Sequence, residues 1–488
     1  MKYSTKKVHF IGICGVAMSA VATALWQKGW KVTGSDAGFF PPVSTHLKNL
    51  GIPYYSGWHP EKMVGGGVPD LVVVGNAIGS TNPEFVYAKE NKIPFKSFPE
   101  IVGDVLIKKN SIVCTGTWGK TTSSALLSHI LKHAKMHPSY MIGGLAADGA
   151  PSAAIDKGNW SVVEGDEYKT AKWDNEAKFF HYKPTHLLLT SVSWDHADMY
   201  PTEKSYFEAF EKLLKMIPKN GKIVVCADNE EARKVAGKTE IGESVVEALR
   251  TNESISVFPA TTVVTYGKNP DATYRYENIK QSAEGISFNI DYHGKKYEIK
   301  SRLLGIYNAE NITGCFAMAK EIGIAPGEIT DAIKTFSGMK RRMEKRYENG
   351  VTVIDDIAHS PEKAKSVLKN LREIYKGKII AVYEPNSGNR TKESVPSYDK
   401  AFEGADEVVI PKLTKLKVDE ENPQKTFGGD ELSKIISKTH ANAIYIDDDL
   451  KLVEHITKNP EEKGCIAFLG SHGFRGMIEE TVQKLASA

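Results

Sequence analysis

Long hydrophobic runs, paired cysteines and an excess of one charge sign are all lacking in this 488-residue sequence. No apolar stretch reaches the roughly 18 residues that a membrane span requires. The five cysteines are scattered and never form a C-x-x-C pair, which argues against a disulfide framework or a zinc cluster and indicates a reducing compartment. Lysine and arginine (63) nearly balance the acidic residues (60), so neither nucleic acid nor membrane binding is favoured.

The composition is that of an ordinary globular protein, with 41% hydrophobic and 25% charged residues. At roughly 150 residues per domain, the length allows about three domains, each able to bury its own core. The N-terminus starts with basic residues, but its apolar stretch is broken by glycines and leads into a βα unit, so no signal peptide is expected. We therefore expect a cytoplasmic protein.

The most informative motif is TGTWGKTT at residues 115–122, which directly follows the apolar run 111–114. A strand, a glycine loop and a helix in this order favour an ATP or GTP site. Backbone N–H groups wrap the phosphates, Lys120 reaches the outer phosphates, and Thr121 can hold Mg²⁺. The pattern is incomplete, because Cys114 stands where the first glycine belongs and Gly116 carries the turn instead. The alternative is a plain glycine turn.

The first segment alternates strands and helices, which predicts a parallel sheet with its ligand at the carboxyl ends of the strands. A strand at 8–13 leads through Gly12 and Gly15 into a helix at 17–28, and the next strand ends at Asp36. The dinucleotide fingerprint is broken, although Asp36 lies at the ribose-reading distance. A bound nucleotide diphosphate is favoured, with NAD or a ligand-free packing turn as alternatives.

In the second segment, acidic residues and a histidine follow predicted strands. The strand 160–163 ends at EGDE (164–167), and the strand 185–190 leads to Asp195 and His196. Next to a phosphate loop these groups are natural magnesium ligands, whereas the alternatives are a solvated acidic turn and a surface loop. Residues 255–303 are interpreted as an antiparallel hairpin region, and Asn308 could be no more than a helix N-cap.

The third segment begins after a possible hinge at Ser337-Gly338. A basic patch at 339–344 favours phosphate contact, with a solvated face as the alternative. Strands at 351–354 and 378–383 end in DDIAHSP and EPNSGNR, and further strands are expected at 407–410, 443–446 and 465–469. The alternation again predicts an α/β domain.

Taken in order, the motifs resemble those of the Mur ligase family over nearly the whole chain. They are GICGVAMSA, GSD, GNAIGSTNPE, TGTWGKTT, EGDEY, DHADMY, GIYNAEN, RRME, DDIAHSP and EPNSGNRT. The resemblance implies an α/β fold of three domains: a Rossmann-like UDP-binding domain (1–108), a central P-loop ATPase-like domain (109–337) and a Rossmann-like C-terminal, peptide-binding domain (338–488). It also implies an ATP- and Mg²⁺-dependent ligase that forms an amide through an acyl phosphate.

Two branches of the family are similar to this sequence. The glycine-rich start and DD-x-x-H-x-P resemble the branch that joins L-alanine to UDP-N-acetylmuramate. EGDEYKTA, the spacing from HYKP to DHADMY, and EPNSGNR resemble the branch that attaches the recycled murein tripeptide L-Ala-γ-D-Glu-meso-diaminopimelate to the same sugar nucleotide. The second branch is favoured, and a monomer or weak dimer is expected.

The resemblance also suggests roles for individual residues. Lys120, Glu164 and His196 would be catalytic, with Thr121, Glu164 and His196 holding magnesium. ATP would contact Gly116, Thr117, Gly119, Lys120, Thr121, Thr122, Asn308, Arg342, Asp356 and His359. The UDP-sugar would contact Gly12, Gly15, Asp36, Asn76, Ala77 and Ile78, and Arg390 would face the peptide carboxylates.

Four positions depart from the family pattern. Trp118 replaces a histidine, Ser191 and Ser193 stand where Asn and Glu are common, and Ser360 replaces a second histidine. These changes keep open a non-catalytic nucleotide-binding protein. A nicotinamide oxidoreductase would explain nothing after about residue 110. A folylpolyglutamate-type ligase would begin close to the phosphate loop, whereas roughly 110 residues precede it here.

Overall fold

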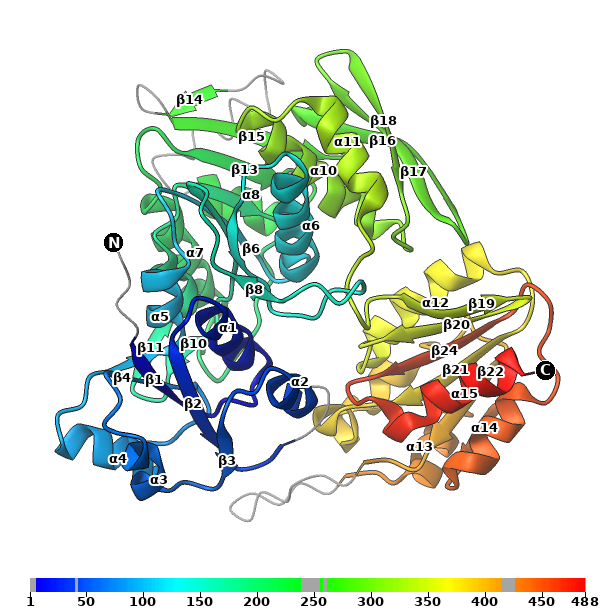
Figure 1. The fold of residues 1–488 in the computed structure, drawn as a ribbon. Helices are drawn as coiled ribbons and strands as arrows, with labels where there is room; N and C mark the ends of the chain where they lie inside the picture. Colours follow the sequence, from blue (N-terminus) through cyan, green and yellow to red (C-terminus); the bar gives the residue numbers. More distant parts are fainter. Residues whose placement is uncertain (1–5, 40–42, 238–254, 258–260, 415–425, 488) are drawn as a thin grey trace. The chain divides into compact units, whose positions relative to one another are not determined.

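The structure is a computed structural model that describes residues 6–39, 43–237, 255–257, 261–414 and 426–487. It divides into two compact units, and the chain passes from the first to the second between Phe336 and Ser337, with segments 279–287 and 301–308 also in the second unit. None of the helices among these described residues is long and apolar enough to cross a membrane. Each unit contains mostly parallel β-sheet flanked by helices (Figure 1).

The N-terminal sheet has the strand order β3-β2-β1-β4-β5, and all its pairings are parallel. Its strands are β1 (Lys7–Ile11), β2 (Lys31–Asp36), β3 (Tyr54–Ser56), β4 (Leu71–Val74) and β5 (Phe95–Ser97). Its helices are α1 (Val16–Gln27), α2 (Val43–Asn49), α3 (Pro60–Gly65), α4 (Pro83–Glu90) and α5 (Phe98–Val105). The strand order reverses between β1 and β4, where a doubly wound sheet opens its ligand crevice.

The central sheet has the order β18-β17-β16-β15-β13-β12-β6-β9-β7-β8, with β14 beside β15. Its strands are β6 (Asn110–Thr115), β7 (Ser139–Met141), β8 (Ala153–Ala154), β9 (Trp160–Gly165), β12 (His186–Leu189), β13 (Lys222–Cys226), β14 (Ile255–Val257), β15 (Thr261–Gly267), β16 (Tyr274–Ser282), β17 (Gly285–Tyr292) and β18 (Lys295–Ser301). A separate pair is formed by β10 (Lys169–Ala171) and β11 (Asp174–Ala177).

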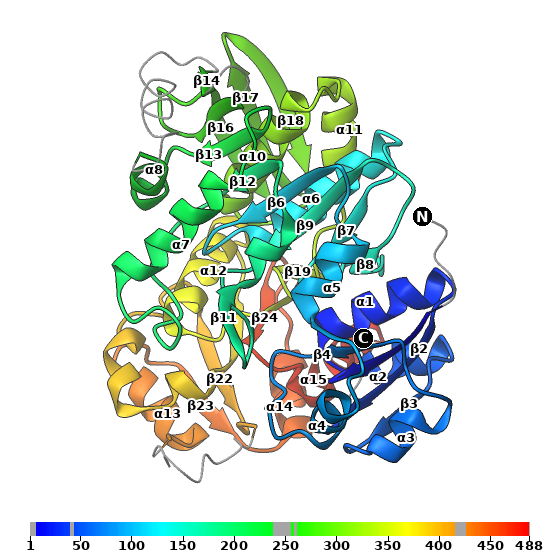
Figure 2. The same cartoon turned by 90° about the vertical axis from the view of Figure 1, so that its left-hand side faces the viewer.

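Helices cover both faces of the central sheet. They are α6 (Lys120–His133), α7 (Glu203–Lys215), α8 (Glu230–Gly237), α10 (Tyr307–Glu321) and α11 (Pro326–Thr335). Figures 1 and 2 show α6 and α7 on opposite sides of β6. The strands β6, β9, β12 and β13 pair in parallel, so their carboxyl ends lie along one edge.

The C-terminal sheet has the order β19-β20-β24-β21-β22-β23, parallel except for the β19–β20 pair. Its strands are β19 (Glu344–Asn349), β20 (Val351–Asp356), β21 (Ile379–Glu384), β22 (Glu407–Pro411), β23 (Ala443–Ile446) and β24 (Cys465–Gly470). Its helices are α12 (Pro361–Ile374), α13 (Gly429–Ile436), α14 (Asp449–Thr457) and α15 (Met477–Ala486).

Alternation along the strands builds a core on each face of the sheets. In β4, Val73 joins the core on the α1 side, whereas Val72 and Val74 join the core that contains Met63 and Phe85. In the C-terminal sheet, the core with α12 and α13 and the core with α14 and α15 are likewise separate. Successive side chains of a strand point to opposite faces, so these runs of apolar residues fit strands buried on both sides.

The α/β fold expected from the sequence is confirmed, with one local difference. The region 255–303 contains the expected β17 and β18, but β15 pairs in parallel with both β13 and β16. Only β14 pairs antiparallel with β15. The segment 268–273 connects β15 to β16, which lies parallel to it, so this segment is not a hairpin turn.

We expect Gly34→Ala to destabilise the protein. A Cβ atom at Gly34 would lie 2.5 Å from Ile13 Cδ1 and 2.7 Å from Ile13 Cβ, too close for Ile13 to relieve by rotating its side-chain end. Overpacking of this kind costs about 1–3 kcal/mol, measurable as a lower urea midpoint.

The matched control is Gly65→Ala, because a Cβ at Gly65 would meet nothing within 4 Å. Equal midpoints for the two variants would contradict the packing argument.

Candidate active site

The glycine loop connects the end of β6 to the start of α6. Gly116 (φ 133°) and Gly119 (φ 84°) both have backbone conformations that favour glycine. A Cβ at Gly116 would lie 2.3 Å from Thr190 Oγ1, and one at Gly119 would lie 2.5 Å from Asn311 Oδ1. The sequence alone indicated one tight turn at Gly116, and the structure shows that both glycines are sterically required.

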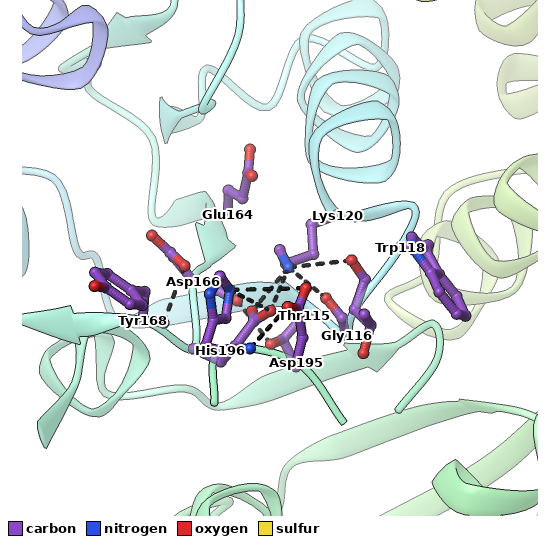
Figure 3. A network of polar contacts seen from close by, with 12 residues as sticks. Thr115, Gly116, Trp118, Lys120, Glu164, Asp166, Tyr168, Asp195 and His196 are labelled. Carbon is purple, nitrogen blue, oxygen red and sulfur yellow. Dashed lines mark hydrogen bonds and ion pairs between the residues drawn. The ribbon is translucent and has the colours of Figure 1, made fainter. Parts of the chain in front are cut away.

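The end of β12 holds this loop. Thr117 N donates to Ser191 O (2.9 Å), and Trp118 N donates to Ser191 Oγ (3.0 Å). Ser193 N in turn donates to Thr117 Oγ1 at 2.8 Å. The serines that depart from the family pattern thus make direct hydrogen bonds to the loop. Trp118 is 59% exposed and projects from the opposite side of the loop to Lys120 (Figure 3).

Lys120, the first residue of α6, turns back onto its own loop. Its Nζ donates to both carboxylate oxygens of Glu167 (2.9 and 2.8 Å) and to Gly116 O (2.6 Å). Glu167 belongs to the EGDE turn, but sequence reasoning gave it no separate role. The sequence placed Glu167 in an acidic turn after a strand. That position does not indicate which carboxylate of the turn faces the glycine loop.

Thr121 and Glu164 lie side by side. Thr121 Oγ1 donates to Glu164 Oε1 at 3.0 Å, and Gly143 N donates to Glu164 Oε2 at 2.7 Å. Burial raises the pKa of the Glu164 carboxyl, an effect that these hydrogen bonds and the Lys120 charge oppose. A hydroxyl and a carboxylate next to a phosphate loop are the oxygen donors that Mg²⁺ takes, so this pair fits the ion. Thr122 follows in the first turn of α6.

His196 approaches the same network from the segment after β12. Its Nε2 lies 3.7 Å from Glu167 Oε1, and its ring centroid lies 4.9 Å from that of Tyr168. Its backbone has φ 58°, a conformation that is uncommon outside glycine and that recurs at functional sites. Within the described residues, no group of three or more His, Cys, Asp or Glu forms a ready metal cluster. Of the predicted magnesium residues, the structure pairs Thr121 with Glu164 and places His196 beside Glu167.

The predicted UDP-site residues occupy the carboxyl edge of the N-terminal sheet. Gly12 (φ 89°) makes the turn after β1, Gly15 is the N-cap of α1, and residues 76–78 (Asn76, Ala77 and Ile78) follow β4. Asp36 Oδ2 accepts a hydrogen bond from Cys14 N at 2.8 Å and so holds the glycine turn. Asn76 Oδ1 is buried without a hydrogen-bond partner among the described residues. An unpaired acceptor at this edge fits a ligand that brings a donor.

The remaining predicted ATP contacts belong to the second unit. Asn308 is the second residue of α10 rather than its N-cap, and its Nδ2 donates to Leu304 O at 2.8 Å. Asp356, at the end of β20, accepts hydrogen bonds from Met343 N (2.7 Å) and Ala358 N (2.8 Å). Arg342 is an exposed residue whose charge acts on Asp356.

His359 lies in the loop after β20. Its Nδ1 is 2.9 Å from Ile357 O, and burial lowers the pKa of its imidazole.

Arg390 lies in the loop after β21, but its side chain is only 3% exposed. Its Nε and Nη2 donate to Pro385 O (3.0 and 2.8 Å), and Nη1 donates to Thr414 O (2.9 Å). Glu384 Oε1 lies 3.6 Å from the guanidinium. In this conformation Arg390 braces the loop, so its predicted contact with a peptide carboxylate stays a prediction.

Three domain families match the chain. They are described as the Mur ligase family, catalytic domain (residues 7–109), the Mur ligase middle domain (114–319), and the Mur ligase, glutamate ligase domain (341–472). A UDP-N-acetylmuramate–L-alanyl-γ-D-glutamyl-meso-2,6-diaminoheptandioate ligase from Haemophilus influenzae is 32% identical over 81% of this chain and 83% of the relative. A UDP-N-acetylmuramate–L-alanine ligase from Rhodopseudomonas palustris is 31% identical over 83% of this chain and 82% of the relative.

Solved structures give the same picture of the fold. The UDP-N-acetylmuramate–alanine ligase of Thermotoga maritima superposes with a TM-score of 0.78 at 25% identity, covering 99% of each chain. A murein peptide ligase from Psychrobacter arcticus has a TM-score of 0.67 at 23% identity, again over 99% of each chain.

The fold and the glycine loop between β6 and α6 fit an α/β ligase. The chain belongs to the Mur ligase family. It is an ATP-dependent ligase of peptidoglycan synthesis that forms amide bonds.

We expect Asp356 to make the second unit less stable as the pH rises. Burial raises the pKa of this carboxyl from its ordinary 3.8 to about 6. The folded chain therefore holds the proton more tightly than the unfolded chain does. The resulting stability is complete below pH 4, falls as the pH rises towards 6, and amounts to roughly 3 kcal/mol.

Urea unfolding of the wild type and Asp356→Asn at pH 4 and pH 6.5 measures this effect. The variant should lose less stability than the wild type between the two pH values. Parallel losses would show that Asp356 does not carry this linkage.

Proposed function

We propose that this ligase joins the murein tripeptide L-Ala-γ-D-Glu-meso-diaminopimelate to UDP-N-acetylmuramate, a step of peptidoglycan recycling. The observation that carries this proposal is the similarity to the Haemophilus influenzae ligase, whose name specifies this peptide, at 32% identity over 81% of the chain. The motifs EGDEYKTA and EPNSGNR, which resemble that branch of the family, support the same choice.

The alternative is a UDP-N-acetylmuramate–L-alanine ligase. It is favoured by several relatives of that name at 28–31% identity and by the Thermotoga maritima structure. Both reactions begin alike. ATP transfers its γ-phosphoryl group to the lactyl carboxylate of the sugar, which gives an acyl phosphate and ADP. The acceptor amine then attacks the acyl carbon, and the tetrahedral intermediate expels phosphate and leaves an amide.

In this proposal, the loop from Gly116 to Thr122 positions the triphosphate. Its N–H groups and the start of α6 offer donors and a positive dipole end to the phosphates. Lys120 supplies the point charge that follows the transferred phosphoryl group, which is a matter of positioning and charge neutralisation rather than covalent chemistry. The family resemblance assigns Asn308, Arg342, Asp356 and His359 to ATP as well.

Thr121, Glu164 and His196 would hold magnesium, whose charge offsets that of the phosphates when the ion is bound. The edge formed by Gly12, Gly15, Asp36 and residues 76–78 would bind the UDP moiety. The buried, unpaired Asn76 Oδ1 supports a ligand with a donor group there. Arg390 is the candidate contact for the acceptor carboxylates, because a guanidinium pairs well with them.

The acceptor is tested by phosphate release in the presence of ATP, Mg²⁺ and UDP-N-acetylmuramate. L-alanine is offered in one series and the tripeptide in another. We expect a higher kcat/KM for the tripeptide, because its several carboxylates give contacts that free alanine lacks. A higher kcat/KM for L-alanine would select the alternative, and no release with either acceptor would exclude both.

The magnesium role of Glu164 is tested with Glu164→Gln. This variant keeps a hydrogen-bond acceptor for Thr121 but loses the charge that Mg²⁺ favours, so its activity should fall and recover partly as Mg²⁺ is raised. Lys120→Ala serves as the comparison. Its activity should not recover when Mg²⁺ is raised, because the metal ion does not replace the lost contact between the lysine and the phosphates. A Glu164→Gln defect that is the same at every Mg²⁺ concentration would remove Glu164 from the metal site.

A further inference from the structure

Lys120 is paired by residues of its own loop and of the neighbouring EGDE turn. An ammonium group has three N–H donors, and Lys120 directs them to Glu167 Oε1, Glu167 Oε2 and Gly116 O at 2.9, 2.8 and 2.6 Å. Its side chain is 15% exposed, so little of it faces solvent. The charge that should meet the outer phosphates is therefore already paired with a carboxylate.

Glu167 is held firmly in this position. Its side chain is 1% exposed, and its backbone O accepts a hydrogen bond from Tyr200 OH at 2.6 Å. The buried Tyr206 OH lies 3.4 Å from Glu167 Oε1 and 3.0 Å from Thr117 Oγ1. Hydrogen bonds thus hold both the backbone and the side chain of Glu167. We therefore expect its carboxylate to stay in place when Lys120 moves.

Phosphate and Glu167 must therefore compete for one cation. A buried carboxylate that loses its partner becomes an uncompensated charge, which is strongly unfavourable. When the phosphates of a nucleotide bind Lys120, the free energy of binding is therefore reduced by the cost of separating Lys120 from Glu167. A glutamine of the same shape would accept a hydrogen bond from Lys120 but would leave no charge behind.

We propose that Glu167 is a positioning residue that holds Lys120 in the orientation described above and competes with the outer phosphates of ATP for its ammonium. The proposal rests on the assignment of the loop to ATP given above. It assigns to the last residue of EGDE a function distinct from the metal-binding role of Glu164. Glu167 sets how tightly the nucleotide binds, because its buried charge loses the ammonium that it pairs with and keeps the His196 imidazole at 3.7 Å and the Tyr206 hydroxyl at 3.4 Å as neighbours.

The test measures the Kd of ATP by calorimetry on the full chain without the other substrates. Glu167→Gln should bind ATP roughly tenfold more tightly or better, since the competing charge is gone. Glu167→Asp retains the charge and should stay closer to the wild type. The matched control is Asp166→Asn, which removes the same charge one residue away but from a carboxylate paired with Lys178 at 2.5 Å. It should change the Kd far less.

If Glu167 served only to stabilise the fold, Glu167→Gln would not strengthen ATP binding. Equal or weaker ATP binding by Glu167→Gln, together with weaker binding by Lys120→Ala, would overturn the proposal and leave the loop assignment intact. If instead Lys120→Ala binds ATP as well as the wild type, the loop assignment itself fails.

A second measurement does not depend on nucleotide. In thermal unfolding, Lys120→Ala should destabilise the protein, and adding Glu167→Gln should restore part of that loss, because the unpaired buried charge is removed. Losses that simply add would show that the two residues do not act as a pair, which would also overturn the proposal.

Discussion

The carboxyl end of β12 supports the glycine loop, and the arrangement of the surrounding site depends on this support. Thr190 Oγ1 donates to the carbonyls of Thr115 (3.1 Å) and Trp118 (2.5 Å), and Ser191 accepts from the N–H groups of Thr117 and Trp118. The contact is so close that only glycine fits at position 116. Since β6 and β12 pair in parallel, one sheet edge fixes both the loop and the segment that carries His196. Contacts within the chain thus fix the shape of the loop, which is the kind of preorganisation that charge stabilisation requires.

Much of this arrangement could be predicted from the sequence, because strand ends obey a simple rule. Glu164, Asp36 and Asp356 each follow an apolar run. In a parallel sheet the carboxyl ends of the strands lie along the same edge, so each residue could be placed at the carboxyl edge of its own sheet. The partners of the side chains could not be predicted in this way. Glu167 meets Lys120 across 47 residues of sequence, and Arg390 folds inward onto Pro385 and Thr414. No periodicity specifies these contacts, because they depend on where irregular loops turn.

The departures from the family pattern are incorporated into the structure. Ser191 and Ser193 hold Thr117 and Trp118, as described above. Ser360 is the N-cap of α12, where its Oγ accepts from Lys363 N at 3.3 Å. Serine is among the preferred residues at such a position. The hydroxyls of Ser191 and Ser360 thus have structural roles, whereas Ser193 contacts the loop through its backbone N–H and C=O. Lys120 and Thr121 remain in place. This weakens the case for a non-catalytic protein, which rested on those substitutions.

The predicted ligand contacts are already occupied by the chain itself, but in two different ways. Asp36 and Asp356 accept from backbone N–H groups. A carboxylate has about four acceptor sites, so it can keep such bonds and still accept from a ribose or a base. Lys120 differs from these two residues, because its three donors are all used and its partner is a charge. If the loop binds ATP as proposed, phosphate must replace Glu167 or Gly116 at this ammonium. The proposed affinity for nucleotide then depends on the exchange of an ion pair at Lys120, whereas the carboxylate contacts would only gain hydrogen bonds.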